Sequence, residues 1–231
     1  SFLHITKAEI DLPDTIDTHT QQVYDKAKQN LNNFISNGVL FREDTPCYYI
    51  YQLVMNGRSQ TGLVCVSSLD DYEKGIIKKH ELTRPEKELD RINHIKTTGA
   101  QTGNVFLAYR NVGAIDALIE LWKKSHDPVY DFKADDGIYH TVWVVNDNDV
   151  INSLTTLFST KVPHTYIADG HHRAASAAKV RKEMGKKATE SAGYFLTTLF
   201  PADQLHILDY NRLVKDLNGE EEETLISYLH D

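Results

Sequence analysis

The sequence predicts a mixed α/β fold, in which a mixed sheet is flanked by helices and contains β-hairpins. Turn signals at Asn56-Gly57 and at Asp135-Asp136-Gly137 separate pairs of strand-like runs, which is typical of hairpins. Elsewhere, short apolar runs alternate with stretches of helical periodicity, which favours strand–helix units. With 231 residues, of which 41% are hydrophobic and 25% charged, the chain can bury a sizeable core. We therefore treat residues 1–231 as one α/β domain.

The expected elements follow from composition and period. Residues 2–5 are expected to be extended. Runs rich in β-branched and aromatic residues predict strands at 47–55, 61–66, 105–110, 129–133, 138–145, 165–168, 193–200 and 205–208. Apolar residues at helical spacing predict helices at 18–37, 84–98, 112–124, 147–159 and 174–184, a short one at 71–77, and further helices beginning at 210–212.

One strand–turn–helix segment carries most of the chemistry. The apolar run at 165–168 is followed by Asp169-Gly170-His171-His172-Arg173 and then by strong helix formers up to Met184, with Gly185 as the expected C-cap. A helix N-terminus offers unpaired N–H groups and about half a positive charge, so it binds anions. Gly170 lets a ligand approach the backbone, and three basic side chains add donors. This arrangement predicts a phosphate site formed by Gly170, His171, His172 and Arg173.

A plainer interpretation stays open at this turn. Asp169 can serve as a helix cap, and Arg173 as a solvated helix charge. A metal site is disfavoured here, because neighbouring helical residues point about 100° apart and so His171 and His172 do not converge as an i, i+4 pair would.

A second basic group is expected on the helix at 84–98. Thr83-Arg84-Pro85-Glu86 has the spacing of a capping box, with proline in the first turn. Basic residues then recur at i, i+3, i+7 and i+10, within an arc of roughly 80°. They are Arg84, Lys87, Arg91 and His94. This stripe is either an anion-facing surface or a solvated helix face. The polar loop that follows it, which contains Gln101 to Gly103, is also suited to contact a substrate.

Composition excludes several classes of protein. A formal net charge of −8 disfavours nucleic-acid binding, which needs a basic face. Cys47 and Cys65 lie in apolar runs and are interpreted as reduced core residues of a cytoplasmic protein. Neither has the flanking groups that depress a thiol pKa, so redox catalysis ranks last. No apolar run approaches the length of a membrane span, and a signal peptide is not evident.

Several separated motifs, in order, carry a resemblance to a known family. They are Ser1-Phe2-Leu3-His4-Ile5, His80-Glu81-Leu82-Thr83, Asp90-Arg91, Val105 to Arg110, Asp169 to Arg173 and Tyr210-Asn211-Arg212. The chain resembles the ParB/sulfiredoxin superfamily, whose members place a Gly-x-x-Arg turn at a helix start over a nucleotide or phosphate. More narrowly, it resembles a widespread ParB-like bacterial family, catalogued as a domain of unknown function, that carries the same Asp-Gly-His-His-Arg.

Two departures qualify the resemblance. Sulfiredoxins place their catalytic cysteine after the glycine, where this chain has His171, so sulfiredoxin chemistry is excluded. Asn104 replaces the proline usual before Val105 in the narrow family, which is interpreted as a tolerable change at a strand edge. The resemblance also implies that the chain is a fragment, lacking an N-terminal segment and a longer C-terminal portion.

The resemblance implies a phosphotransferase or phosphatase acting on a small metabolite, of the serine kinase or phosphoserine phosphatase type. Phosphoryl transfer chiefly needs positioning and charge stabilisation, which the turn and the basic stripe could supply. Glu81, in a loop beside His80 and the basic helix, is the first candidate for general base, with His80 grouped as a candidate catalytic residue. Asp169 is the second candidate base, or a ligand for magnesium.

Candidate cofactors are Mg²⁺ and a nucleotide, ATP or ADP. The expected partner is a small phosphorylated metabolite or nucleotide, with no nucleic acid and no membrane, and a homodimer is left open. A different class also stays open, a nucleotide-binding regulatory module without turnover, which would use the same anion site but need no base.

Overall fold

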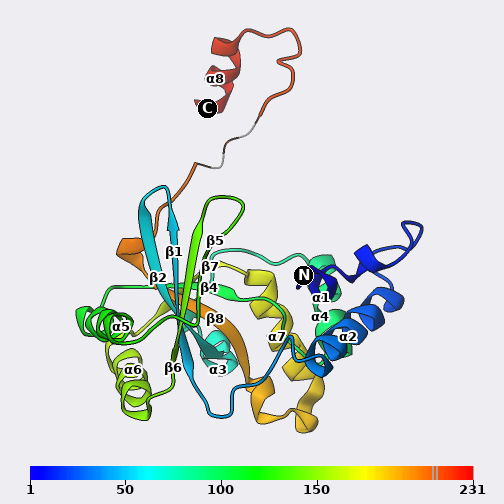
Figure 1. The fold of residues 1–231 in the computed structure, drawn as a ribbon. Coiled ribbons are helices and arrows are strands. Elements are labelled where there is room, and N and C mark those ends of the chain that lie inside the picture. The colour runs from blue at the N-terminus through cyan, green and yellow to red at the C-terminus, as the bar shows by residue number, and fades with distance from the viewer. Residues whose placement is uncertain (210, 212, 231) are drawn as a thin grey trace.

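An eight-stranded mixed sheet forms the centre of the molecule, which confirms the predicted fold class (Figure 1). The computed structural model describes residues 1–209, 211 and 213–230. The strands are β1 (Tyr48–Met55), β2 (Arg58–Ser68), β3 (Ile77–Lys78), β4 (Val105–Tyr109), β5 (Tyr130–Lys133), β6 (Tyr139–Val145), β7 (Thr165–Asp169) and β8 (Tyr194–Pro201). Their order across the sheet is β3-β7-β4-β8-β2-β1-β6-β5.

One half of the sheet is built from the two predicted hairpins. β1 pairs antiparallel with β2 and with β6, and β6 pairs antiparallel with β5. Asn56 and Gly57 link β1 to β2 with φ angles of 52° and 77°. Two central residues with positive φ are the requirement of the commonest two-residue hairpin turn, and Asn-Gly meets it at little cost.

The other half of the sheet positions the candidate site. β7 lies between β3, with which it pairs parallel, and β4, with which it pairs antiparallel. Because β3 and β7 run in the same direction, the segments that follow them leave the sheet at the same edge. Because β4 runs the other way, the loop that precedes β4 reaches that edge too. Asn104, in this loop, donates its Nδ2 to Thr198 Oγ1 at 3.1 Å.

The helices other than α8 form two groups beside the sheet (Figure 1). The helices are α1 (Leu3–Thr6), α2 (Gln21–Ser36), α3 (Leu69–Glu73), α4 (Pro85–Thr98), α5 (Gly113–Ser125), α6 (Asn148–Lys161), α7 (His171–Met184) and α8 (Glu222–His230). α5 packs against α6 at one side. At the other, α7 packs against the sheet, α4 against α7, and α2 against α4. In Figure 1, α8 is drawn apart from the sheet and the other helices.

The core lies between the sheet and these helices. Its fully or nearly fully buried members come from strands and helices alike: Ile50, Leu63, Val105, Leu107, Ile115, Trp122, Leu154, Ile167, Ala174 and Phe195. Burying each of the larger side chains stabilises the fold by about 1.5–3 kcal/mol. The alanines of α7 contribute by their small size, because Ala174 and Ala177 let the helix lie close to the strands beneath it.

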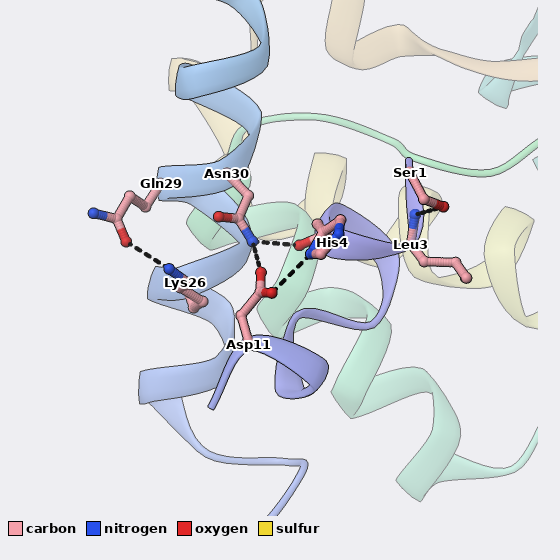
Figure 2. A network of polar contacts seen from close by, with 7 residues as sticks. All are labelled: Ser1, Leu3, His4, Asp11, Lys26, Gln29 and Asn30. Atoms are coloured by element: carbon pink, nitrogen blue, oxygen red, sulfur yellow. Dashed lines mark hydrogen bonds and ion pairs between the residues drawn. The ribbon is translucent and has the colours of Figure 1, made fainter. Parts of the chain in front are cut away.

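The prediction of an extended segment at 2–5 is wrong, because Leu3 to Thr6 form helix α1. This segment has no strand beside it and is held by side chains of two helices. Asn30 of α2 donates to the His4 carbonyl at 2.6 Å and to Asp11 Oδ2 at 2.7 Å, and His4 donates through Nδ1 to Asp11 Oδ1 at 2.7 Å (Figure 2). Tertiary contacts therefore outweigh the strand propensity of an apolar tetrapeptide.

Three further predictions need correction. The strand expected at 205–208 is absent from the described structure there, because β8 is already paired on both sides, with β4 and β2, and offers no free edge. The short helix predicted at 71–77 is α3, which ends at Glu73, and Ile77 begins β3 instead. The capping box at Thr83 is also wrong, because the N-cap of α4 is Arg84, without a side-chain hydrogen bond. Of the helix start predicted at 210–212, Tyr210 and Arg212 lie outside the described residues.

Candidate functional site

The predicted strand–turn–helix is present, as β7, Gly170 and α7. Gly170 is the N-cap of α7 and has a φ of +100°, a conformation that L side chains rarely adopt. A Cβ there would lie 2.9 Å from Arg173 Nε and 3.2 Å from Val105 Cα. Glycine is thus required twice, by the backbone angle and by the close approach of β4 and of the Arg173 side chain.

A cleft of about 840 Å³ opens beside this turn. The whole predicted turn lines it, as does Glu81 from the loop after β3, while α4 contributes both charged and polar side chains. The charged residues, histidines and glycine of its lining are His19, Glu81, Glu86, Lys87, Asp90, Arg91, Asp169, Gly170, His171, His172 and Arg173. The turn is therefore at the surface of a cleft, with room for a ligand, and not closed inside the core.

A smaller cavity of about 180 Å³ adjoins the cleft. Arg91 and Arg173 line both hollows. Gln101, Thr102 and Gly103 line the smaller one, so the polar loop singled out in the sequence lies beside Arg173. A Cβ on Gly103 would lie 3.1 Å from Arg173 Cδ, so this side chain runs between two glycines, Gly103 and Gly170.

Arg173 is held by the residue that precedes the turn. Its Nη2 donates to Asp169 Oδ2 at 2.5 Å, and the Asp169 side chain is itself well exposed. The ion pair orients the guanidinium at the junction of the two hollows. Asp169 therefore already has an ion-pair partner, Arg173. This makes Asp169 a weaker candidate for a general base or a magnesium ligand.

The parallel pairing of β3 with β7 brings His80 and Glu81 to His171. The His80 amide donates to His171 Nε2 at 3.4 Å, and the two imidazoles meet edge to face with ring centroids 4.4 Å apart. His171 Nδ1 lies 3.4 Å from Glu81 Oε2. Burial, the largest effect, lowers the pKa of His171, although the neighbouring Glu81 carboxylate opposes this shift. The His80 and Glu81 side chains are exposed, whereas His171 is buried.

The basic stripe of α4 divides between the cleft and the core. Lys87 and Arg91 line the cleft, and within the described part of the chain neither forms an ion pair. His94 lines the smaller cavity but is buried, and its Nε2 donates to the Ile5 carbonyl at 2.9 Å, which fastens α1 to α4. Arg84 caps the exposed start of α4 and is not among the residues lining either hollow.

Two cleft residues were not expected from the sequence. Tyr24 donates its hydroxyl to Asp90 Oδ1 at 2.9 Å, and His19 Nδ1 meets the same oxygen at 3.0 Å. Burial and the Asp90 carboxylate raise the pKa of Tyr24 to about 12, so its hydroxyl is a donor at neutral pH. Neither residue has a local pattern that would reveal this contact.

Of the two cysteines predicted to be core residues, Cys65 packs against the core, whereas Cys47 is half-buried and lies outside the core cluster. Cys47 and Cys65 are free thiols, and burial raises the pKa of Cys65 to about 11, which opposes formation of a reactive thiolate. Among the described helices, none has both the length and the apolar character needed to cross a membrane.

The fold and the site together define a mixed α/β protein whose cleft is lined by a glycine turn, by exposed Glu81 and by Lys87 and Arg91, which form no ion pair among the described residues. The chain belongs to the family described as protein of unknown function (DUF1015), which it matches over residues 1–231. Neither the curated proteins nor the solved structures contain a match to it.

Proposed function

We propose that this protein binds a phosphate-bearing small metabolite or nucleotide in the cleft and transfers or hydrolyses a phosphoryl group there. The observation that carries the proposal is the convergence, on one cleft of about 840 Å³, of the Gly170 turn with Arg173, Arg91 and Lys87. Three basic side chains and a helix N-terminus, which come from two helices, can contact a multiply charged anion. The same cleft is also lined by carboxylates, those of Glu81, Glu86, Asp90 and Asp169.

Arg173 and Arg91 are the expected phosphate contacts. Both line the junction of the two hollows, and an arginine presents a planar fork that matches two phosphate oxygens at once. Arg91 and Lys87 have no carboxylate to satisfy them in the described structure, so an incoming anion would not need to displace one. Arg173 would keep or exchange its contact with Asp169 when a ligand binds.

Glu81 is the proposed general base. Its side chain is 59% exposed and lines the cleft, while Asp169 is already paired with Arg173. In a kinase, Glu81 would take the proton of the acceptor hydroxyl as the phosphoryl group is transferred. In a phosphatase, it would take the proton of the attacking water. Mg²⁺ and ATP or ADP are the candidate cofactors of the first reaction.

The resemblance to the ParB/sulfiredoxin superfamily, and to its ParB-like bacterial branch, suggests serine or phosphoserine as the first substrate to test. We propose membership in that superfamily on the Gly170-x-x-Arg173 turn at a helix start, beside a cleft. The mixed sheet flanked by helices is compatible with it, and the Asp-Gly-His-His-Arg sequence favours the narrower branch.

Substitution of Arg173 tests the phosphate site. Arg173→Lys keeps the charge but loses the fork, so binding of ADP or phosphoserine should weaken by about 1 kcal/mol or more, roughly five-fold. Arg173→Ala should weaken phosphorylated ligands further and spare serine. Stability should change little, because the Asp169–Arg173 pair is an exposed ion pair worth roughly 0–1 kcal/mol. Calorimetric titrations and melting curves of the three proteins measure both effects.

Unchanged affinity of Arg173→Ala for phosphorylated ligands would remove Arg173 from the site. Glu81→Gln then separates the enzyme from a binding module. Loss of turnover with ADP or phosphoserine binding retained supports catalysis. If the Glu81→Gln variant retains the function of the parent protein in the cell, the non-catalytic nucleotide-binding module is supported instead.

A further inference from the structure

We propose that His80, Glu81 and His171 form a site for a divalent transition metal at the wall of the cleft. Each residue offers one donor atom, and these atoms all lie within 4.8 Å of one another. The site was not expected from the sequence, which directs attention to the adjacent pair His171 and His172. It goes beyond the proposed function and does not depend on it, because Zn²⁺ binding needs no phosphorylated ligand. The two proposals share Glu81, whose carboxylate would no longer be a free base while it is bound to a metal.

The separation of the donors fits coordination better than a hydrogen bond. His171 Nδ1 lies 3.4 Å from Glu81 Oε2. A charge-assisted hydrogen bond between such groups is shorter, about 2.7–2.9 Å. Two ligands bound to one ion at about 2.0–2.1 Å in tetrahedral geometry lie roughly 3.4 Å apart. The three donors therefore need only small side-chain movements to meet a common ion.

The donor types select the metal. Imidazole suits zinc, cobalt and iron, whereas magnesium is bound mainly through carboxylates, phosphates and water. Two histidines with one glutamate, and a fourth position left open, is the ligand set of several catalytic zinc sites. We therefore expect Zn²⁺ or Co²⁺ to bind in preference to Mg²⁺.

The arrangement of the chain supports an adaptable site. His171 is fixed by burial, with its side chain only 3% exposed, whereas Glu81 is 59% exposed and belongs to an exposed loop. Binding through Nδ1 places the ring proton on Nε2, so the His80 amide that now faces Nε2 at 3.4 Å must turn away. Residues 79–82 of this loop are exposed, which leaves them space to move.

The open position would face the cleft, since both Glu81 and His171 line it. An ion there could bind a phosphate oxygen or a water molecule next to Arg173, as a Lewis acid. This would add positive charge to a cleft in which the carboxylates of Glu81, Glu86, Asp90 and Asp169 accompany the basic side chains of Lys87, Arg91 and Arg173.

Calorimetric titration of the metal-free protein with Zn²⁺, and absorption spectroscopy with Co²⁺, test the site without any substrate. We expect one Zn²⁺ per chain, a tetrahedral Co²⁺ spectrum, and no comparable binding of Mg²⁺. His80→Ala and Glu81→Gln should each weaken Zn²⁺ binding more than the about 10–100-fold typical of losing a residue that only supports a ligand. Both residues are exposed, so both variants should fold.

Two matched histidine variants control for unspecific binding. His172→Ala, next to the site, and His164→Ala, at an exposed position before β7, should bind Zn²⁺ like the parent. Equal weakening in His172→Ala, or parental affinity in Glu81→Gln and His80→Ala, would overturn the proposal. Titration of the metal-free protein with ADP tests the phosphate site separately, so either site can fail without the other.

Discussion

Gly170 has a backbone conformation and surroundings that leave no room for a side chain. Its φ is +100°, and a Cβ would meet both the Arg173 guanidinium and the backbone of β4. The Arg173 side chain could move aside, but Val105 Cα, 3.2 Å away, could not. The residue therefore controls both the stability of the turn and the position of Arg173.

Gly170→Ala should destabilise the protein by about 1–3 kcal/mol, because a strained φ costs this much. It should also weaken binding of ADP or phosphoserine, since the guanidinium must shift. Chemical denaturation and calorimetry measure the two effects.

Gly113→Ala is the matched control. Gly113, at the start of α5, has ordinary φ, and a Cβ there would contact nothing within 4 Å. The Gly113→Ala variant should be as stable as the parent or more stable, because alanine has a higher helix propensity than glycine. Equal stability of Gly170→Ala and Gly113→Ala would show that the turn tolerates a side chain.

At this scale the sequence predicts the turn well, and the structure confirms its bounds to within a few residues. A glycine between a β-branched run and a run of helix formers is a local signal. The contact of His171 with His80 and Glu81 is different. His80 is 91 residues away from His171 in the sequence. No local pattern indicates which loop lies beside the turn.

Among the elements, α4 and α7 carry most of the basic residues of the cleft and pack against each other through a buried acid. Glu88 of α4 is 3% exposed and forms an ion pair with Lys179 of α7. Its backbone carbonyl also accepts from the Ser176 hydroxyl at 3.3 Å. Burial alone would raise the pKa of Glu88, but hydrogen bonds from Lys179 and Thr83 and the Lys179 charge outweigh it and hold the pKa below its ordinary value.

This pair should make stability depend on pH. Since the folded-state pKa is lowered, ionised Glu88 favours folding above the ordinary carboxyl pKa of about 4.3, and the contribution is lost as the pH falls through the lower folded value. Glu88→Gln should have a free energy of unfolding about 1–3 kcal/mol lower than that of the parent near neutral pH. Between about pH 5 and 3, its free energy of unfolding should fall less than that of the parent. Denaturation at several pH values measures this.

Glu73→Gln provides the comparison, because Glu73 is exposed at the end of α3. It should keep the pH dependence of the parent. If Glu88→Gln also keeps it, the α4–α7 contact does not depend on the charge of Glu88.

Long helices and hairpins could be predicted from the sequence. Short elements, and elements that depend on contacts with distant parts of the chain, could not. The hairpin at Asn56-Gly57 and helix α4 have strong periodic or turn signals. β3 has only two residues, Ile77 and Lys78, and exists because β7 offers it an edge. The apolar run at 205–208 has the pattern of a strand. However, β8, the strand that precedes it in the chain, is already paired on both sides and cannot pair with it.

Across the whole molecule, the N-terminal segment connects the helical layer to the smaller cavity. Asn30 donates to the His4 carbonyl and to Asp11 (Figure 2). His94 donates to the Ile5 carbonyl, and Thr6 lines the cavity together with Arg91. Asn30 is itself buried. The segment is thus held by polar contacts to α2 and α4 and by the burial of Ile5 and Ala8, the latter packed against Val23 and Ala27 of α2.

Asn30→Ala should remove two hydrogen bonds and destabilise the fold by about 1–3 kcal/mol. Amide hydrogen exchange in residues 3–11 should accelerate more than in the sheet. Gln29→Ala is the control, because Gln29 is exposed and accepts a hydrogen bond from Lys26 Nζ at 3.3 Å within the same helix (Figure 2). Uniform acceleration throughout the chain would instead indicate that the segment unfolds only with the whole molecule.

The parallel pairing of β3 with β7 has a consequence for how the protein acquires its site during folding. β3 ends at Lys78 and its partner begins at Thr165, so a long stretch of chain must fold or be closed as a loop before the two can pair. Pairing between such distant segments is slow, whereas hairpins and helices form early. On the ribosome, the β1–β2 hairpin can form long before residue 165 is synthesised. We therefore expect His80 and Glu81 to meet His171 only after the β1–β2 hairpin has formed, so that Zn²⁺ binding appears later during refolding than the hairpin.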